Sequence, residues 1–291
     1  MKKGLISTIT LLFLFVLTAC GGGDDDTPTF TIGVIPAQTE GEMEGAMDKL
    51  QTTLNEGLNR EVSVEVYPDY NGVVEAMNYE KIDMAFLGPL TYVIAQHKSG
   101  AKAIVTQLIN DEPYYYSYII THSDNPWNSL DEFLKNSNDV DFAFGDPNST
   151  SGSLIPSIEL EDRGFYVSED EHAFNSVRYT GSHDATALAV QNQQVDAGAI
   201  DSAIYHQLVQ AGKINGEKIN IIWKSDKLFQ YPWAVHQNTD EETIEQLQQI
   251  FLSIEDKEIL DAFGATGFTK ASNEDYQSIK DAAIKQGIIK E

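Results

Sequence analysis

Hydrophobic and polar positions change period repeatedly along the chain after Thr29. Short apolar or alternating runs predict strands, and runs with apolar residues three or four positions apart predict helices. The expected strands are residues 29–35, 62–68, 83–88, 103–108, 115–121, 141–145, 176–180, 195–200 and 219–225. The expected helices are residues 43–54, 73–82, 91–97, 129–136, a segment ending near 161, 185–193 and 203–211, with a mostly helical tail from Glu241. Strands that alternate with helices predict mainly parallel sheets covered on both faces.

Three short polar segments follow predicted strands directly. They are "GPLT" (88–91), "GDPNSTSG" (145–152) and "GSHDAT" (181–186). In open α/β sheets, ligands bind beyond the carboxyl ends of strands, where the next helix begins. The coincidence of three such junctions predicts a ligand site at the edge they share.

The segment 145–152 carries the strongest signal for an anion. Ser149 or Thr150 can cap the following helix, and Pro147 favours an extended approach to it. A cap needs only one such residue, whereas Ser149, Thr150 and Ser151 precede Gly152 in one run. Together they offer hydroxyls and backbone N–H groups at the positive end of a helix dipole, which suits a phosphate-like anion. These residues alone leave a plain cap and an anion site equally open.

Other polar side chains near strand ends are candidates for the same site. His183 lies beside Asp184 in the third junction and can donate a hydrogen bond to an anion, although a lone His is more often structural. In "DEPYYYSYII", strand alternation places Tyr115 on the face opposite to its tyrosine neighbours, most of which we expect to be packing residues. Tyr70 also follows a strand end.

The N-terminal segment has the features of a secretory signal. Lys2 and Lys3 precede an apolar run that ends in "LTAC", which resembles the lipobox of bacterial lipoproteins. We expect residues 1–19 to be a signal peptide, Cys20 to be lipidated and residues 20–28 to form a flexible tether. The alternative is an uncleaved anchor helix with an incidental Cys. Because Cys20 is the only cysteine, no disulfide can form within the chain.

Charge and motif content narrow the classes of function. The formal charge of −26 becomes −28 once Lys2 and Lys3 are removed, which argues against nucleic acid and anionic lipid surfaces as partners. A small anion remains possible if neutral dipoles bind it at short range, since surface charges are screened beyond roughly 8–10 Å. P-loop, H-E-x-x-H, C-x-x-C and G-x-G-x-x-G motifs are absent, and a Ser151–His183–Asp triad is only arithmetically possible. We therefore expect no enzyme, no cofactor and no metal.

Four stretches together resemble the substrate-binding proteins of phosphonate, phosphite and phosphate ABC importers. They are "DYNGVVEAMNYEKIDMAFLGPLTY", "YYSYII", "GDPNSTSG" with Pro156, and "HDATALAVQNQQVDAGA" ahead of "IIWKS". The resemblance spans roughly residues 31–234. It implies an α/β, type II periplasmic-binding fold, in which two lobes are joined by a two-strand hinge and enclose the ligand. The first lobe would comprise residues 29–118 and 225–291, and the second residues 119–224.

The resemblance also implies the site. The oxygens of the ligand would be bound by the hydroxyl run and the histidine, with two tyrosines facing the ligand: Ser149, Thr150, Ser151, His183, Tyr70 and Tyr115. Receptors for 2-aminoethylphosphonate clasp the ammonium with two carboxylates, and these positions fall on Ala203 and Tyr231. Neither is acidic, although Asp201 lies two residues from the first and could replace it. We therefore expect a ligand without an amine, with Tyr231 and Trp233 filling the space of an aminoethyl chain.

The implied function is a lipid-anchored, extracytoplasmic and monomeric receptor. It would capture phosphite, methylphosphonate or phosphate in preference to 2-aminoethylphosphonate, and deliver it to an ABC permease with its ATPase. The membrane contact would be made through the lipid on Cys20. Alternatives are a two-lobed receptor for another small anion, a receptor for a sensor kinase and, less favoured, an enzyme on the same fold with His183 or Ser151 as the reactive group.

Overall fold

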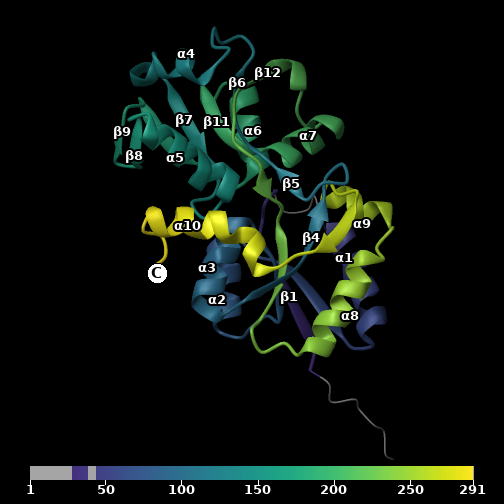
Figure 1. Cartoon of the computed structure of the whole chain (residues 1–291). Helices are drawn as coiled ribbons and strands as arrows, with labels where there is room; N and C mark the ends of the chain where they lie inside the picture. The colour runs from purple at the N-terminus through teal and green to yellow at the C-terminus, as the bar shows by residue number, and fades with distance from the viewer. Residues whose placement is uncertain (1–27, 39–43, 291) are drawn as a thin grey trace, which may run out of the picture.

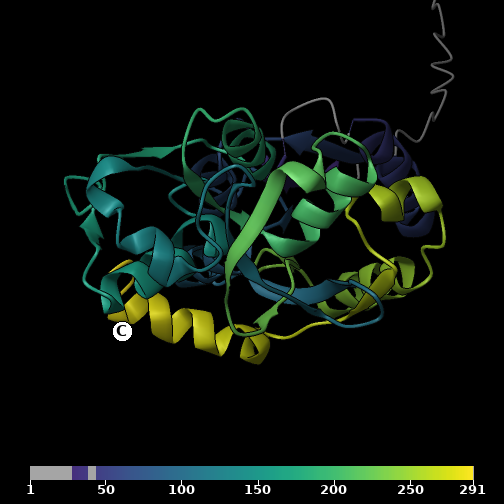
Figure 2. The same cartoon turned by 90° about the horizontal axis from the view of Figure 1, so that it is seen from above.

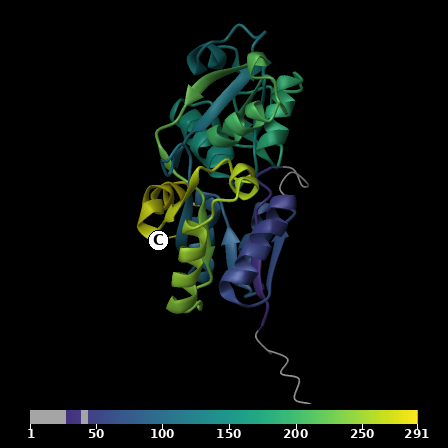
Figure 3. The same cartoon turned by 90° about the vertical axis from the view of Figure 1, so that its right-hand side faces the viewer.

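The computed structural model describes residues 28–38 and 44–290, which form two α/β lobes stacked on one another (Figures 1 and 3). The predicted signal peptide, Cys20 and almost all of the tether lie outside the described residues. Among the residues that are described, no helix combines the length and apolar character needed to cross a bilayer.

The first lobe is built on a six-stranded sheet in the order β15-β4-β14-β3-β1-β2. Its strands are β1 (Phe30–Val34), β2 (Val62–Val66), β3 (Met84–Phe86), β4 (Lys102–Leu108), β14 (Pro232–Val235) and β15 (Gly267–Lys270). Its helices are α1 (Glu44–Leu58), α2 (Tyr70–Asn78), α3 (Pro89–Ser99), α8 (Glu241–Leu252), α9 (Lys257–Ala262) and α10 (Gln277–Lys285), with a 3₁₀ turn at Asn273–Tyr276. The chain thus returns to this lobe after building the second one (Figure 1).

The second lobe contains a five-stranded sheet in the order β10-β7-β11-β6-β12. Its strands are β6 (Ser117–His122), β7 (Asp141–Phe144), β10 (Ser176–Tyr179), β11 (Ala197–Asp201) and β12 (Ile219–Lys224). Its helices are α4 (Leu130–Leu134), α5 (Ile155–Asp162), α6 (His183–Gln191) and α7 (Ser202–Gln210), with a π-helical turn at Thr150–Leu154 and 3₁₀ turns at Ser137–Asp139 and Gly216–Lys218. Short ribbons pair β5 (Tyr114–Tyr115) with β13 (Leu228–Phe229) and β8 (Tyr166–Ser168) with β9 (Glu171–His172).

The expectation of mainly parallel sheets is wrong. β1 is parallel to β2 and β3, but β14 is antiparallel to both β3 and β4, and β15 is antiparallel to β4. In the second sheet β7 is parallel to β10 and β11, whereas β6 is antiparallel to β11 and β12. β14 and β15 were not predicted, because β14 begins with a proline and both strands pair with partners far away in the chain. Mixed sheets arise here because the chain enters and leaves each lobe through strands without a crossover helix.

Contacts between distant segments hold the lobes together. At the crossing, the Ser117 N–H donates to Ser225 Oγ and the Ser225 N–H donates to the Ser117 carbonyl, both at 2.9 Å. On the outside, the C-terminal helix α10 reaches the second lobe, where Gln286 donates to Glu161 (2.7 Å). Seen from above, α10 lies along the flank beside α5 (Figure 2). The junctions that carry the candidate residues therefore face one another across the boundary between the lobes.

Candidate functional site

The segment that follows β7 folds into a tight turn that opens toward the first lobe. Ser149 is the N-cap residue, and its Oγ accepts from the Gly152 N–H at 3.1 Å. Gly145 N–H donates to the Gly152 carbonyl at 2.8 Å. A Cβ on Gly152 would lie 2.9 Å from Ser149 Oγ and 3.2 Å from Gly145 Cα, so only glycine allows this approach. The prediction of a cap at Ser149 or Thr150 is confirmed for Ser149.

The neighbouring hydroxyls of Thr150 and Ser151 have other surroundings. Thr150 Oγ1 accepts from the Leu90 N–H, at the start of α3 in the first lobe, at 2.7 Å. Ser151 is held through its backbone carbonyl, which accepts from Ser117 Oγ at 2.6 Å, while its own hydroxyl has no hydrogen-bond partner among the described residues. A plain helix cap accounts for Ser149 alone, because capping uses neither of the other two hydroxyls.

Three buried hydroxyls without hydrogen-bond partners in the described part of the chain gather at this turn. They are Ser151 Oγ, Tyr70 Oη and Tyr115 Oη, and they account for three of the seven such side-chain atoms. The hydroxyls of Ser151 and Thr150 lie close enough to Tyr115 to affect its pKa, and Ser149 has the same relation to Tyr70. An unsatisfied buried hydroxyl costs about 1–3 kcal/mol. Three of them in one place indicate a binding site for a group that accepts hydrogen bonds.

The tyrosines at this site are donors at neutral pH. Burial raises the pKa of Tyr70, Tyr115 and Tyr231 well above the ordinary value, and the negative charge of Asp201 acts in the same direction on each. The Tyr115 and Tyr231 rings pack edge to face, with centroids 5.4 Å apart. The rings therefore fix the direction in which these hydroxyls can donate.

His183 is the first residue of α6, behind the N-cap residue Ser182. Its Nδ1 accepts from the Asp201 N–H at 3.3 Å, so the proton of the neutral ring is on Nε2, which lies 3.2 Å from Tyr231 Oη. Burial lowers the pKa of His183 to about 4, although the charge of Asp184 opposes this. His183 is thus a neutral donor and contributes no positive charge.

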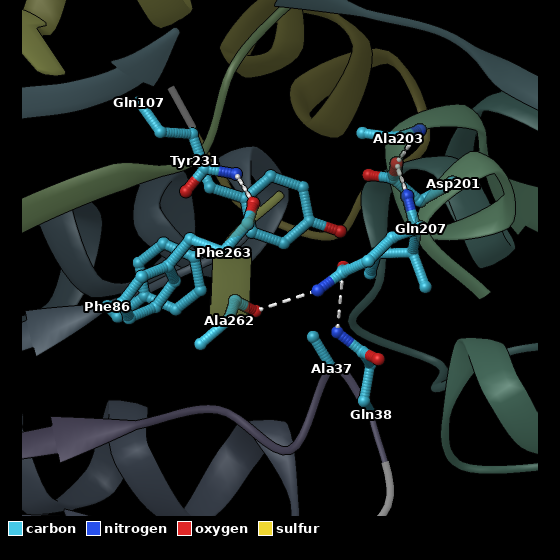
Figure 4. A pocket seen from close by; sticks show the side chains of 11 residues that line it. Ala37, Gln38, Phe86, Gln107, Asp201, Ala203, Gln207, Tyr231, Ala262 and Phe263 are labelled. Carbon is cyan, nitrogen blue, oxygen red and sulfur yellow. Dashed lines mark hydrogen bonds between the residues drawn. The ribbon is translucent and has the colours of Figure 1, made fainter. Parts of the chain in front are cut away.

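Asp201 is the N-cap residue of α7 and is 1 % exposed. One carboxylate oxygen, Oδ1, accepts from the N–H groups of Ala203 (2.6 Å) and Ile204 (3.1 Å). Burial raises the pKa of Asp201 to about 7, although these two N–H groups and the Tyr231 hydroxyl oppose the shift. The Tyr231 hydroxyl points toward this carboxylate (Figure 4). Because Tyr231 Oη accepts from His183, its own proton is available to other acceptors. The three residues thus lie in a ring, in which hydrogen bonds join His183 to Asp201 and to Tyr231.

A cavity of about 20 Å³ adjoins this ring. Asp201, Ala203 and Tyr231 line it on one side and Phe86 and Phe263 on another (Figure 4). Such a volume holds about one water-sized group. Trp233 does not line the cavity. It packs against Phe86, with ring centroids 5.0 Å apart, whereas Tyr231 lines the cavity.

The lobes are closed over the site. The His183 N–H donates to the Ala37 carbonyl at 3.1 Å, in addition to the bond between Leu90 and Thr150. Gln207 on α7 donates to the carbonyls of Asp261 (2.6 Å) and Ala262 (3.2 Å) in the first lobe (Figure 4). Sequence reasoning missed Gln207, because nothing in its local pattern distinguishes it from any other polar residue on a helix.

The structure thus brings together all eight predicted binding residues: Ser149, Thr150, Ser151, His183, Tyr70, Tyr115, Asp201 and Tyr231. None of them carries a permanent positive charge, so an anion would be held by hydroxyl, imidazole and backbone donors. In residues 28–38 and 44–290, no cluster of three or more His, Cys, Asp or Glu side chains is arranged to hold a metal ion. Chemically, the arrangement suits the capture of a small oxyanion.

Comparison with known proteins gives matches over most of the chain. A family model described as "ABC transporter, phosphonate, periplasmic substrate-binding protein" matches residues 32–276. The "Phosphate-import protein PhnD" of Mycolicibacterium smegmatis is 30% identical, over 84% of this chain and 80% of that protein. The "Phosphonates-binding periplasmic protein" of Escherichia coli is 24% identical, over 98% and 85% respectively.

A third relative is known in three dimensions. The "Probable ABC transporter phosphite binding protein PhnD1" of Prochlorococcus marinus is 24% identical, over 89% of this chain and 90% of that protein. Its structure in complex with methylphosphonate superposes with a TM-score of 0.80, covering 90% of this chain and 99% of that one. At this identity the superposition shows the shared two-lobed periplasmic-binding fold.

Proposed function

Because the chain belongs to the family of periplasmic substrate-binding proteins of phosphonate ABC transporters, we propose that it is the receptor that captures a small phosphorus oxyanion and delivers it to an ABC permease with its ATPase. It is a binding protein rather than an enzyme, as are its relatives, and it acts on the extracytoplasmic side of the membrane. We propose lobe boundaries after Tyr118 and Lys224, beside the crossing; the first of these falls two residues inside β6, and the second at the end of β12.

The observation that carries this proposal is the group of buried hydroxyls of Ser151, Tyr70 and Tyr115, which have no hydrogen-bond partner among the described residues. A tetrahedral oxyanion can accept from all three at once, with further donors at the surrounding turn. Hydrogen bonds to a charged acceptor are worth about 1.5–3 kcal/mol each, so few are needed to give strong binding. Binding by neutral donors also explains how a chain with a formal charge of −26 takes up an anion.

We propose phosphite, methylphosphonate or phosphate as the ligand, in preference to 2-aminoethylphosphonate. The positions of an ammonium clasp hold Ala203 and Tyr231, and the adjoining cavity of about 20 Å³ has room for a substituent no larger than a water-sized group. The relatives from M. smegmatis and P. marinus are named for phosphate and phosphite, and the latter was crystallised with methylphosphonate. A buried ammonium is strongly disfavoured without a charge partner, and Asp201 is the one carboxylate among the cavity-lining residues that could serve as one.

Calorimetric titration of the purified receptor with these four ligands tests the proposal. We expect at least one of the three amine-free ligands to bind at least tenfold more tightly than 2-aminoethylphosphonate. Ala203→Glu combined with Tyr231→Asp restores both carboxylates and should narrow or reverse that preference. If the wild-type protein prefers 2-aminoethylphosphonate and Asp201→Asn abolishes this preference, Asp201 is the amine partner and the assignment is wrong. If none of the four ligands binds, the proposed function itself fails.

We also propose that the receptor is monomeric and is held at the membrane by a lipid on Cys20. The support is the signal-like N-terminus that ends in "LTAC". Cys20→Ser should release the protein into the medium or leave the precursor unprocessed. Membrane association that persists in Cys20→Ser, with the signal still removed, would exclude this form of anchoring.

A further inference from the structure

The Asp201 carboxylate lies within the anion site. Its negative charge raises the pKa of Tyr70, Tyr115 and Tyr231, which places it close to the hydroxyls that would donate to the ligand. Its backbone N–H donates to His183, whose other nitrogen reaches Tyr231. A ligand held by these donors therefore shares its surroundings with a carboxylate.

Among the described residues, no group that faces this carboxylate supplies a compensating positive charge. The titratable groups that face it are tyrosines from α2, β5, β6 and the loop before β14, together with the imidazole at the start of α6: Tyr70, Tyr115, Tyr118, Tyr231 and His183. Burial keeps the imidazole neutral, and the phenols remain protonated. On α7 itself, His206 lies 3.5 Å from Tyr118 Oη, and burial lowers its pKa as well. Two further carboxylates, Asp146 and Asp184, also act on Tyr70, so the other charges near this group are negative as well.

Closure around an anion would therefore bring two negative charges together in a dry site. Like charges at such range disfavour each other strongly unless one of them is protonated. The Oδ1 atom of Asp201 accepts from two backbone N–H groups, whereas no backbone N–H of the described residues donates to its other oxygen. Asp201 also lines the cavity, together with Tyr231. The geometry thus leaves one oxygen that can share a proton with an oxygen of the ligand.

We propose that Asp201 makes ligand capture proton-coupled, so that the closed site holds a doubly charged phosphorus oxyanion together with one proton shared with this carboxylate. The inference rests on the proposed function and adds the protonation state of the bound ligand. The proton comes from solvent and forms one O–H bond, either on the ligand or on Asp201, and no other bond changes. Above both the second pKa of the ligand and the pKa of about 7 to which burial raises Asp201, neither free partner carries this proton, so binding must take it up.

Calorimetry in buffers of different ionisation enthalpy measures this uptake. The probe is whichever of phosphite, methylphosphonate and phosphate binds the wild type most tightly. It is titrated at least one pH unit above both its own second pKa and the pKa of Asp201. We expect uptake of about one proton per ligand, and an affinity that falls about tenfold for each further pH unit. Asp201→Asn keeps a good helix cap but cannot share a proton, so uptake and the pH dependence should both disappear.

Asp256→Asn is the matched control. Asp256 caps α9 through the same pattern, accepting from the N–H groups of Glu258 (2.8 Å) and Ile259 (3.3 Å), but it is exposed and pairs with Lys49. This variant should keep the full proton uptake. Binding by the wild type without proton uptake overturns the inference and leaves the proposed function intact, as does uptake that persists in Asp201→Asn. If Asp201→Asn does not fold, the proton uptake measured with the wild type still tests the inference.

Discussion

Ser151→Ala separates the two contributions that this hydroxyl makes, one to ligand binding and one to stability. Ser151 is fully buried, its Oγ has no hydrogen-bond partner in the described part of the chain, and its backbone is fixed by Ser117. Alanine can therefore take the same position without moving the turn. The substitution removes one donor to the ligand and no hydrogen bond between described residues.

The expected effects have opposite signs. Loss of a hydrogen bond to a charged ligand costs about 1.5–3 kcal/mol, which lowers affinity roughly ten- to a hundredfold. In the ligand-free protein the same change removes a buried hydroxyl that has no partner, so the free energy of unfolding should stay the same or rise by about 1 kcal/mol. A substitution that disrupted packing would lower both quantities.

Calorimetric titration gives the affinity, and urea unfolding of the ligand-free protein gives the stability. Ser157→Ala is the matched control, since Ser157 lies further along the same segment and donates only to the Leu154 carbonyl, at 2.8 Å. It should leave the affinity unchanged. If Ser151→Ala binds every phosphorus oxyanion as tightly as the wild type, the hydroxyl run is a helix cap and the site has been assigned wrongly.

Three further predictions concern a contact between the lobes, the pH dependence of stability and the core of the second lobe. Thr150→Val leaves the Leu90 N–H without its acceptor in the closed form, so calorimetry should show an affinity loss of roughly five- to a hundredfold, and an unchanged affinity would show that this bond does not support closure. Between pH about 4 and 6.5, the lowered pKa of His183 makes stability fall with falling pH, because the unfolded chain binds a proton that the folded protein does not. The raised pKa of Asp201 has the opposite effect on stability, so the two contributions cancel in the wild type. Asp201→Asn should therefore lose roughly 3 kcal/mol of unfolding free energy, measured by urea titration, as the pH falls from about 6.5 to 4. A stability of this variant that does not change with pH would contradict the assignment of His183 as a buried neutral imidazole. Phe142→Ala, in the aromatic core of the second lobe, should cost about 3–5 kcal/mol of unfolding free energy without changing ligand specificity.

The order of strands and helices in the first two thirds of the chain follows from its local periodicity, and the structure confirms most of these elements. The tail was harder to interpret, because β14 and β15 are short strands whose pairing partners are far away in sequence. Nothing local distinguishes such a strand from a loop. The antiparallel pairing of β14 with β3, and of β6 with β11, likewise depends on how the chain crosses between the lobes. No short window of the sequence contains that information.

The sequence by itself determined which residues stand at the strand ends: the hydroxyl run after β7, His183 at the start of α6 and Asp201 at the start of α7. A strand end and a helix start depend on neighbouring residues, so local reasoning reaches them. Only the tertiary structure decided which of these groups is satisfied. Thr150 finds a backbone partner in the other lobe, whereas the Ser151 hydroxyl finds none among the described residues. Tyr231, in the loop before β14, lies 48 positions after His183 and reaches it and Asp201. Hydrogen-bond satisfaction and burial depend on contacts between distant segments, and these exist only once the two lobes are packed together.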